Sequence, residues 1–123
     1  MPRARVLPSV LTALLVALFT LAGCAAEPAP ATIDPAAVII DVRTPAEYAE
    51  GHLEGAINLD VQADSFAQQL TELASDGTYV VYCRSGRRSA QAAALLQQAG
   101  LTVTDAGSME AAAKVTGLKV VTD

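Results

Sequence analysis

The sequence predicts a single small α/β domain, built from a mostly parallel sheet that is flanked by helices on both faces. Short apolar segments alternate with segments of helical periodicity along the chain. Several apolar segments are nearly continuous, which is typical of strands buried on both faces of a parallel sheet. Alternating strands and helices are the pattern from which α/β folds are built.

The first predicted strand covers residues 36–42, which read A-A-V-I-I-D-V. A short helix follows, because Thr44 can cap it, Pro45 suits its first position and Glu47 completes a capping box. This helix ends at one of two glycines, Gly51 or Gly55.

The middle of the chain is expected to add two strands and a helix. Residues 56–59 form the second predicted strand. Residues 62–74 carry apolar side chains at helical spacing and end before the turn signal at 75–77. The third strand, residues 78–82, reads T-Y-V-V-Y and is rich in β-branched and aromatic residues.

An alanine-rich helix is predicted over residues 89–99, opened by Ser89 and followed by a glycine. The rest of the chain is expected to form a strand, a turn, a short serine-capped helix and a final strand. The strand covers residues 101–104 and the turn covers 105–107. The helix starts after Ser108, and the final strand covers 118–121.

Residues 1–23 have the layout of an export signal. Arg3 and Arg5 form a basic start, and an apolar stretch follows over residues 10–22. This stretch is shorter than the ~20 residues of a membrane-spanning helix and suits a signal peptide. Residues 21–24 (L-A-G-C) are similar to the lipobox of bacterial lipoproteins, in which Cys24 becomes the lipid-modified N-terminus. The alternative is a simple cleaved signal followed by an unrelated cysteine.

Lipid chains on Cys24 would anchor the protein in the bacterial cell envelope, on its periplasmic or extracytoplasmic face. Residues 24–35 are rich in alanine and proline, so they predict a flexible, extended tether before a folded domain over 36–123. Cys83 is then the one free thiol of an exported chain. Because exported compartments oxidise thiols, an unpaired cysteine there indicates a chemical role unless it is buried and inert.

The charge of the chain excludes some partners. Without residues 1–23, six basic and 13 acidic side chains remain, a net charge of −7 with the histidine neutral. Such a surface is poorly suited to nucleic acid or to anionic lipid headgroups.

The loop 83–88, which reads C-R-S-G-R-R, holds three of those six basic residues and follows a predicted strand directly. Loops at the carboxyl ends of parallel strands are where α/β sheets bind ligands. Backbone N–H groups that lead into a helix form an anion site, and positive charge beside a thiol lowers its pKa. We therefore expect Cys83 to be a reactive thiolate, the alternative being a solvated basic loop with an incidental cysteine.

Two segments carry a resemblance to a known family. D-V-R-T-P-A-E-Y-A-E-G-H-L-E-G-A-I-N-L (residues 41–59) and C-R-S-G-R-R-S (residues 83–89) resemble the rhodanese homology domain, the second segment being similar to its active-site loop. With the T-D-A-G-S segment at 104–108, the chain is most similar to exported single-domain rhodaneses of the phage-shock type.

The resemblance implies sulfur transfer through a persulfide on Cys83, from thiosulfate or a similar anionic donor to cyanide or a thiol. It implies a catalytic role for Cys83 and donor binding by the loop residues, namely Arg84, Ser85, Gly86, Arg87 and Arg88. Arg88 is our first choice of arginine, because it lies nearest the start of the predicted helix. No cofactor is expected.

Three further residues are interpreted as structural or pocket-forming. His52 belongs to the Gly51-His52-Leu53 turn of the resemblance and is expected to be structural, although a Cys–His pair is the alternative. Asp41 and Arg43 flank the end of the first strand and can pair with each other or shape the pocket. One histidine with one free cysteine offers no metal cluster, so we expect no metal.

Two other functions stay open as alternatives. A noncatalytic rhodanese-like module could carry sulfur or bind a partner, because fold alone does not establish activity. Phosphatases and arsenate reductases also use a thiolate in an anion-binding loop. Their signature places five residues between cysteine and arginine, whereas four separate Cys83 from Arg88, so this alternative is disfavoured.

Overall fold

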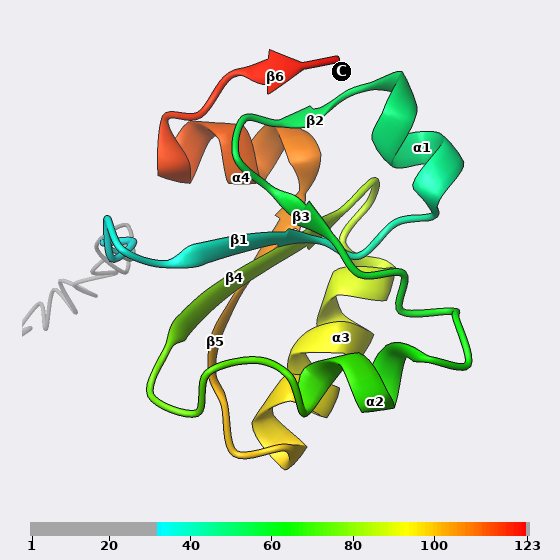
Figure 1. Cartoon of the computed structure of the whole chain (residues 1–123). Coiled ribbons are helices and arrows are strands. Elements are labelled where there is room, and N and C mark those ends of the chain that lie inside the picture. The colour runs from blue at the N-terminus through cyan, green and yellow to red at the C-terminus, as the bar shows by residue number, and fades with distance from the viewer. Residues whose placement is uncertain (1–31, 123) are drawn as a thin grey trace, which may run out of the picture.

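The computed structural model describes residues 32–122 and has a four-stranded sheet at its centre (Figure 1). The strands lie in the order β3-β1-β4-β5, and each neighbouring pair is parallel. Their bounds are Ile57–Asn58 (β3), Val38–Asp41 (β1), Thr78–Cys83 (β4) and Thr102–Ser108 (β5). The predicted fold class is therefore confirmed.

Helices cover both faces of the sheet, as expected (Figure 1). One face packs against α2 (Phe66–Leu70) and α3 (Arg87–Gln98), and the other against α4 (Met109–Thr116) with α1 (Pro45–Glu50) beside it. β4 separates the two cores: alternate residues along it contribute to opposite faces. The side chain of Cys83 belongs to the α2–α3 face.

A second, two-stranded sheet was not predicted. His52–Leu53 (β2) pairs in antiparallel fashion with Val120–Val121 (β6). β6 lies within the final strand predicted over residues 118–121, whereas β2 is only two residues long, too short for a period-2 pattern to be recognised. The pairing fixes β6 against β2, the strand that follows α1.

Several predicted boundaries were wrong. α2 spans Phe66–Leu70 rather than residues 62–74, and it begins late because Asp60 forms a turn with Gln62 that competes with the helix. α3 begins at Arg87, so Ser89 lies inside its first turn. β5 continues to Ser108 through the predicted turn, because an irregularity in its pairing with β4 accommodates these residues.

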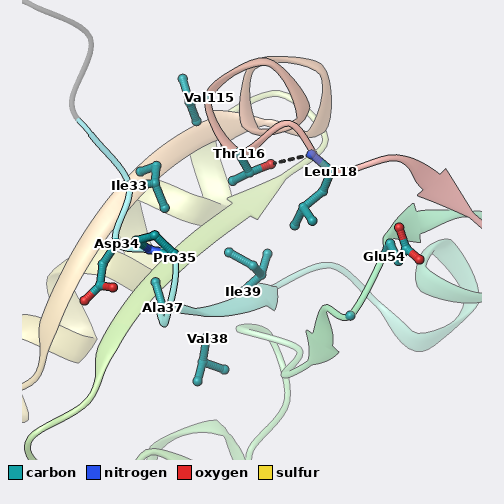
Figure 2. Close-up of a pocket in the computed structure, with 11 residues that line it drawn as sticks. Ile33, Asp34, Pro35, Ala37, Val38, Ile39, Glu54, Val115, Thr116 and Leu118 are labelled. Atoms are coloured by element: carbon teal, nitrogen blue, oxygen red, sulfur yellow. Dashed lines mark hydrogen bonds between the residues drawn. The ribbon is translucent and has the colours of Figure 1, made fainter.

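A cavity lies at the amino end of β1 (Figure 2), whereas Cys83 lies at the carboxyl end of the neighbouring parallel strand β4. Its volume is about 510 Å³, and Val38, Val115 and Leu118 contribute to its apolar wall. Glu54 lies on its rim.

The predicted signal, Cys24 and most of the predicted tether fall outside the described residues. Within residues 32–122, no helix is both long and apolar enough to cross a membrane.

α1 and α3 are joined by an ion pair across the carboxyl end of the sheet. Glu47 completes the capping box of Thr44, and both of its carboxylate oxygens also accept hydrogen bonds from Arg88, at 2.7 and 2.9 Å. The bond to Arg88, together with the Thr44 contacts, outweighs burial and lowers the pKa of Glu47 to about 2. Glu47 therefore does more than cap its own helix.

Replacing Glu47 with glutamine is expected to destabilise the fold by about 1–2 kcal/mol at neutral pH, since one partner of a charged pair is lost. A carboxylate with a lowered folded-state pKa stabilises the fold above its unfolded pKa. That contribution is lost as the pH falls from about 4.5 through about 2. Urea unfolding at pH 7, 4 and 3 should therefore show the difference between wild type and Glu47→Gln shrinking with acidity.

The exposed Glu72→Gln variant provides the control, and it should stay within about 0.5 kcal/mol of wild type throughout. A difference between wild type and Glu47→Gln that did not change with pH would contradict the assigned role of this carboxylate.

Candidate active site

Cys83 is the last residue of β4, and its side chain is fully buried at the carboxyl end of the sheet. The backbone N–H of Gly86 donates a hydrogen bond of 2.9 Å to its Sγ. Gly86 has φ +96°, a left-handed conformation that glycine adopts without strain. This turn lets the chain curl over the sulfur and begin α3 at the next residue.

The environment of Cys83 favours its ionised form. Burial opposes ionisation, but the Ser89 hydroxyl and the backbone N–H groups of Ser89, Gly86 and Ser85 stabilise the charged form and outweigh it. Together they lower the pKa of the Cys83 thiol below its usual value. A thiol whose ionisation is favoured at a helix start is a candidate nucleophile for attack on an electrophilic atom.

Ser89, the last residue of the 83–89 segment, supports the site, whereas the sequence predicted for it only a position at the start of a helix. It is fully buried, and its hydroxyl donates to the carbonyl oxygen of Gly86 at 3.0 Å. A longer contact of 3.4 Å reaches the carbonyl oxygen of Gly107 in β5. Its sequence signal was a lone serine at the start of an alanine-rich helix, which a cap explains equally well.

The three loop arginines occupy different environments. Arg88 is half-buried, and its two terminal guanidinium nitrogens each donate a hydrogen bond to the carboxylate of Glu47. Arg84 and Arg87 are exposed, and neither forms an ion pair within residues 32–122. Arg84 lines a depression of about 310 Å³ beside the loop. The structure thus leaves Arg84 and Arg87 as the loop cations that no carboxylate neutralises.

Asp41 and Arg43 form a buried ion pair just beyond the end of β1. Nε of Arg43 donates to Asp41 Oδ1 at 2.9 Å, and its terminal nitrogen donates to Oδ2 at 2.6 Å. The same nitrogen also donates to the carbonyl oxygen of Gly51 at 2.6 Å, which ties the end of α1 to the sheet. With these bonds satisfied, the pair is a structural support beside the site.

His52 is buried in β2, and its ring stacks on that of Tyr48 at 3.7 Å between centroids. Its Nδ1 lies 2.9 Å from the carbonyl oxygen of Tyr48. These contacts give His52 a packing role at the end of α1. Within the described part of the chain, no three His, Cys, Asp or Glu side chains gather in a way that could hold a metal ion.

Curated relatives of this chain carry sulfurtransferase names. A sulfurtransferase of Allochromatium vinosum is 41% identical over 63 residues, which are 51% of this chain and 57% of that protein. The thiosulfate sulfurtransferase PspE of Escherichia coli is 37% identical over 72 residues, 58% of this chain and 69% of that protein. The chain therefore spans little more than half of the first relative's length.

Solved structures show the same fold. A rhodanese with anions from E. coli is 32% identical, with a TM-score of 0.57 over 72% of this chain and the whole of that one. A rhodanese-related protein from Thermoplasma volcanium is 31% identical, with a TM-score of 0.61 over 72% of this chain and 86% of that one. A family model, the rhodanese-like domain, matches residues 27–113. The chain belongs to the rhodanese-like domain family.

Proposed function

We propose that this protein is a sulfurtransferase that moves sulfane sulfur from thiosulfate or a similar donor to a thiophilic acceptor, through a persulfide on Cys83. One observation carries the proposal: the Cys83 sulfur lies at a strand end, 2.9 Å from the Gly86 N–H, in a loop that opens a helix. The sulfurtransferase names of the relatives support the same reaction class.

In the first half of the reaction, the Cys83 thiolate attacks the outer sulfur of thiosulfate. A sulfur–sulfur bond to Cys83 forms while the sulfur–sulfur bond of thiosulfate breaks, and sulfite leaves with the bonding electron pair. Cys83 then carries a persulfide, whose negative charge the backbone N–H groups of the loop can stabilise.

The donor is an anion, so a cation beside the loop would raise its local concentration. Arg84 and Arg87 fit this role because no carboxylate among the described residues neutralises them. Arg88, our first choice from the sequence, donates its hydrogen bonds to Glu47. In the proposed mechanism Arg88 therefore positions the loop, and the exposed arginines meet the donor.

In the second half, an acceptor nucleophile takes the outer sulfur and returns Cys83 to the thiolate. A cyanide ion would leave as thiocyanate, and a thiolate would leave as a persulfide. Because the two substrates react in turn on one cysteine, ping-pong kinetics are expected.

The proposal also places the protein at a membrane surface. Residues 1–24 follow the order of a lipoprotein signal, ending at Cys24. Acyl chains on Cys24 would hold the domain in the cell envelope, on the extracytoplasmic face.

The Cys24→Ala variant is expected to lose membrane association when it is produced in its bacterial host. Fractionation of cells should move the protein from the membrane pellet to the soluble extract, and thiosulfate:cyanide activity of the domain should be retained. Recovery of Cys24→Ala in the membrane pellet at the wild-type level would contradict lipid anchoring at this residue.

The Cys83→Ser variant is expected to lose thiosulfate:cyanide activity entirely, since serine cannot form a persulfide. Intact-mass measurement after thiosulfate treatment should show the mass of one added sulfur atom on the wild type and none on the variant. Circular dichroism controls for the fold. A folded wild type that acquires no sulfur and yields no thiocyanate would overturn the proposal and favour a noncatalytic module.

A further inference from the structure

The depression beside the loop is built by residues from four separate elements. Arg84 comes from the loop after β4, Glu50 from the end of α1, Met109 from the start of α4 and Val120 from β6. Its volume is about 310 Å³, near the lower end of the range for small-molecule pockets. A depression of this size therefore suits a small compound better than the surface of a partner protein.

The charges around this depression are of two kinds. Arg43 and Glu47 also line it, but each is satisfied by its own ion-pair partner, Asp41 and Arg88 respectively. Arg84 and Glu50 are exposed, and neither is ion-paired within residues 32–122. One positive and one negative charge are thus left open to a ligand in the same depression.

An apolar surface completes the lining. Val120 is 53% exposed, unusual for so large an apolar side chain, and Met109 shares the same wall. A ligand that fills the depression would cover both side chains, while its charged groups met Arg84 and Glu50.

The depression borders the loop that holds the reacting sulfur. Arg84, which lines the depression, follows Cys83 directly in the chain, and Glu47, which also lines it, is bonded to Arg88 at the other end of the loop. The depression is therefore a binding place at the edge of this loop.

We propose that this depression binds the sulfur acceptor, and that the acceptor is a small thiol bearing both a carboxylate and an ammonium group. The carboxylate meets Arg84, the ammonium meets Glu50, and the carbon chain lies over Met109 and Val120. This inference rests on the proposed function. Arg84 can serve donor and acceptor in turn, because sulfite leaves before the acceptor reacts in a ping-pong cycle.

The reaction at this site is a direct transfer. The acceptor thiolate attacks the outer sulfur of the Cys83 persulfide, and a new sulfur–sulfur bond forms on the acceptor. The bond between that sulfur and Cys83 breaks, and its electron pair returns to Cys83 as thiolate. No oxidant or reductant is consumed.

The test isolates the second half of the reaction. Protein with a persulfide on Cys83 is prepared with thiosulfate, or with inorganic polysulfide where thiosulfate gives no persulfide. It is mixed with one of four thiols: cysteine, cysteine methyl ester (ammonium only), N-acetylcysteine (carboxylate only) or 2-mercaptoethanol (neither charge). The loss of the persulfide is followed by mass spectrometry, and each rate constant is expressed per thiolate present.

Cysteine is expected to react fastest of the four per thiolate. Glu50→Gln should lower the rate constants with cysteine and cysteine methyl ester by about 2–5-fold, which is the range for one exposed charge pair. The rate constant with 2-mercaptoethanol should not change. The matched control is Glu54→Gln. It removes the same charge from another exposed glutamate, which lines the distant cavity of Figure 2, and should affect none of the four.

The inference is overturned if the four thiols react at one rate per thiolate, or if Glu50→Gln and Glu54→Gln behave alike. Either result would leave the proposed function intact, because persulfide formation from thiosulfate is measured beforehand. Conversely, failure of thiosulfate to form the persulfide would defeat that function, while the polysulfide-loaded protein would still test acceptor recognition.

Discussion

The hydrogen bond from the Gly86 N–H to the Cys83 sulfur is the contact on which the rest of the site depends. A fully buried thiol would ordinarily stay neutral, since low-dielectric surroundings penalise its charge. Here the loop curls over the sulfur, and the Ser89 hydroxyl together with the N–H groups of Ser89, Gly86 and Ser85 outweighs the effect of burial on the pKa of Cys83. That curl requires the left-handed conformation of Gly86, where any side chain would bring strain.

Several contacts away from the sulfur hold this curl in place. The hydroxyl of Ser89 ties the Gly86 carbonyl to α3, and the Arg88–Glu47 pair ties the start of α3 to α1. Beyond the carboxyl end of β1, Arg43 forms an ion pair with Asp41 and donates a hydrogen bond to the carbonyl oxygen of Gly51. The charged groups at this edge are therefore mostly committed to one another. Within residues 32–122, Arg84, Arg87 and Glu50 form no ion pair at this edge and can meet a ligand.

Much of this arrangement could be predicted from local sequence. The apolar strands, the capping box at Thr44 and the cysteine-containing loop are set by residues close together in the chain, and the fold class follows from their order. The partner of Arg88 lies 41 residues away, so no local pattern could identify Glu47. The two-residue strand β2 is defined by its pairing with β6 and has no recognisable local pattern, whereas β6 lies inside the strand predicted over residues 118–121. Ser89 was misread because capping and loop support favour the same residue type at a helix start.

We propose that polar groups of the loop lower the pKa of the Cys83 thiol despite its burial. The most direct measurement is the rate of alkylation by iodoacetamide as a function of pH, in a Cys24→Ala background with a single thiol. We predict a midpoint below the ~8.5 of an unperturbed cysteine. We also predict a higher midpoint in Ser89→Ala, and no change in Ser85→Ala, which keeps its backbone N–H. A wild-type midpoint at or above that of a free cysteine would contradict the account.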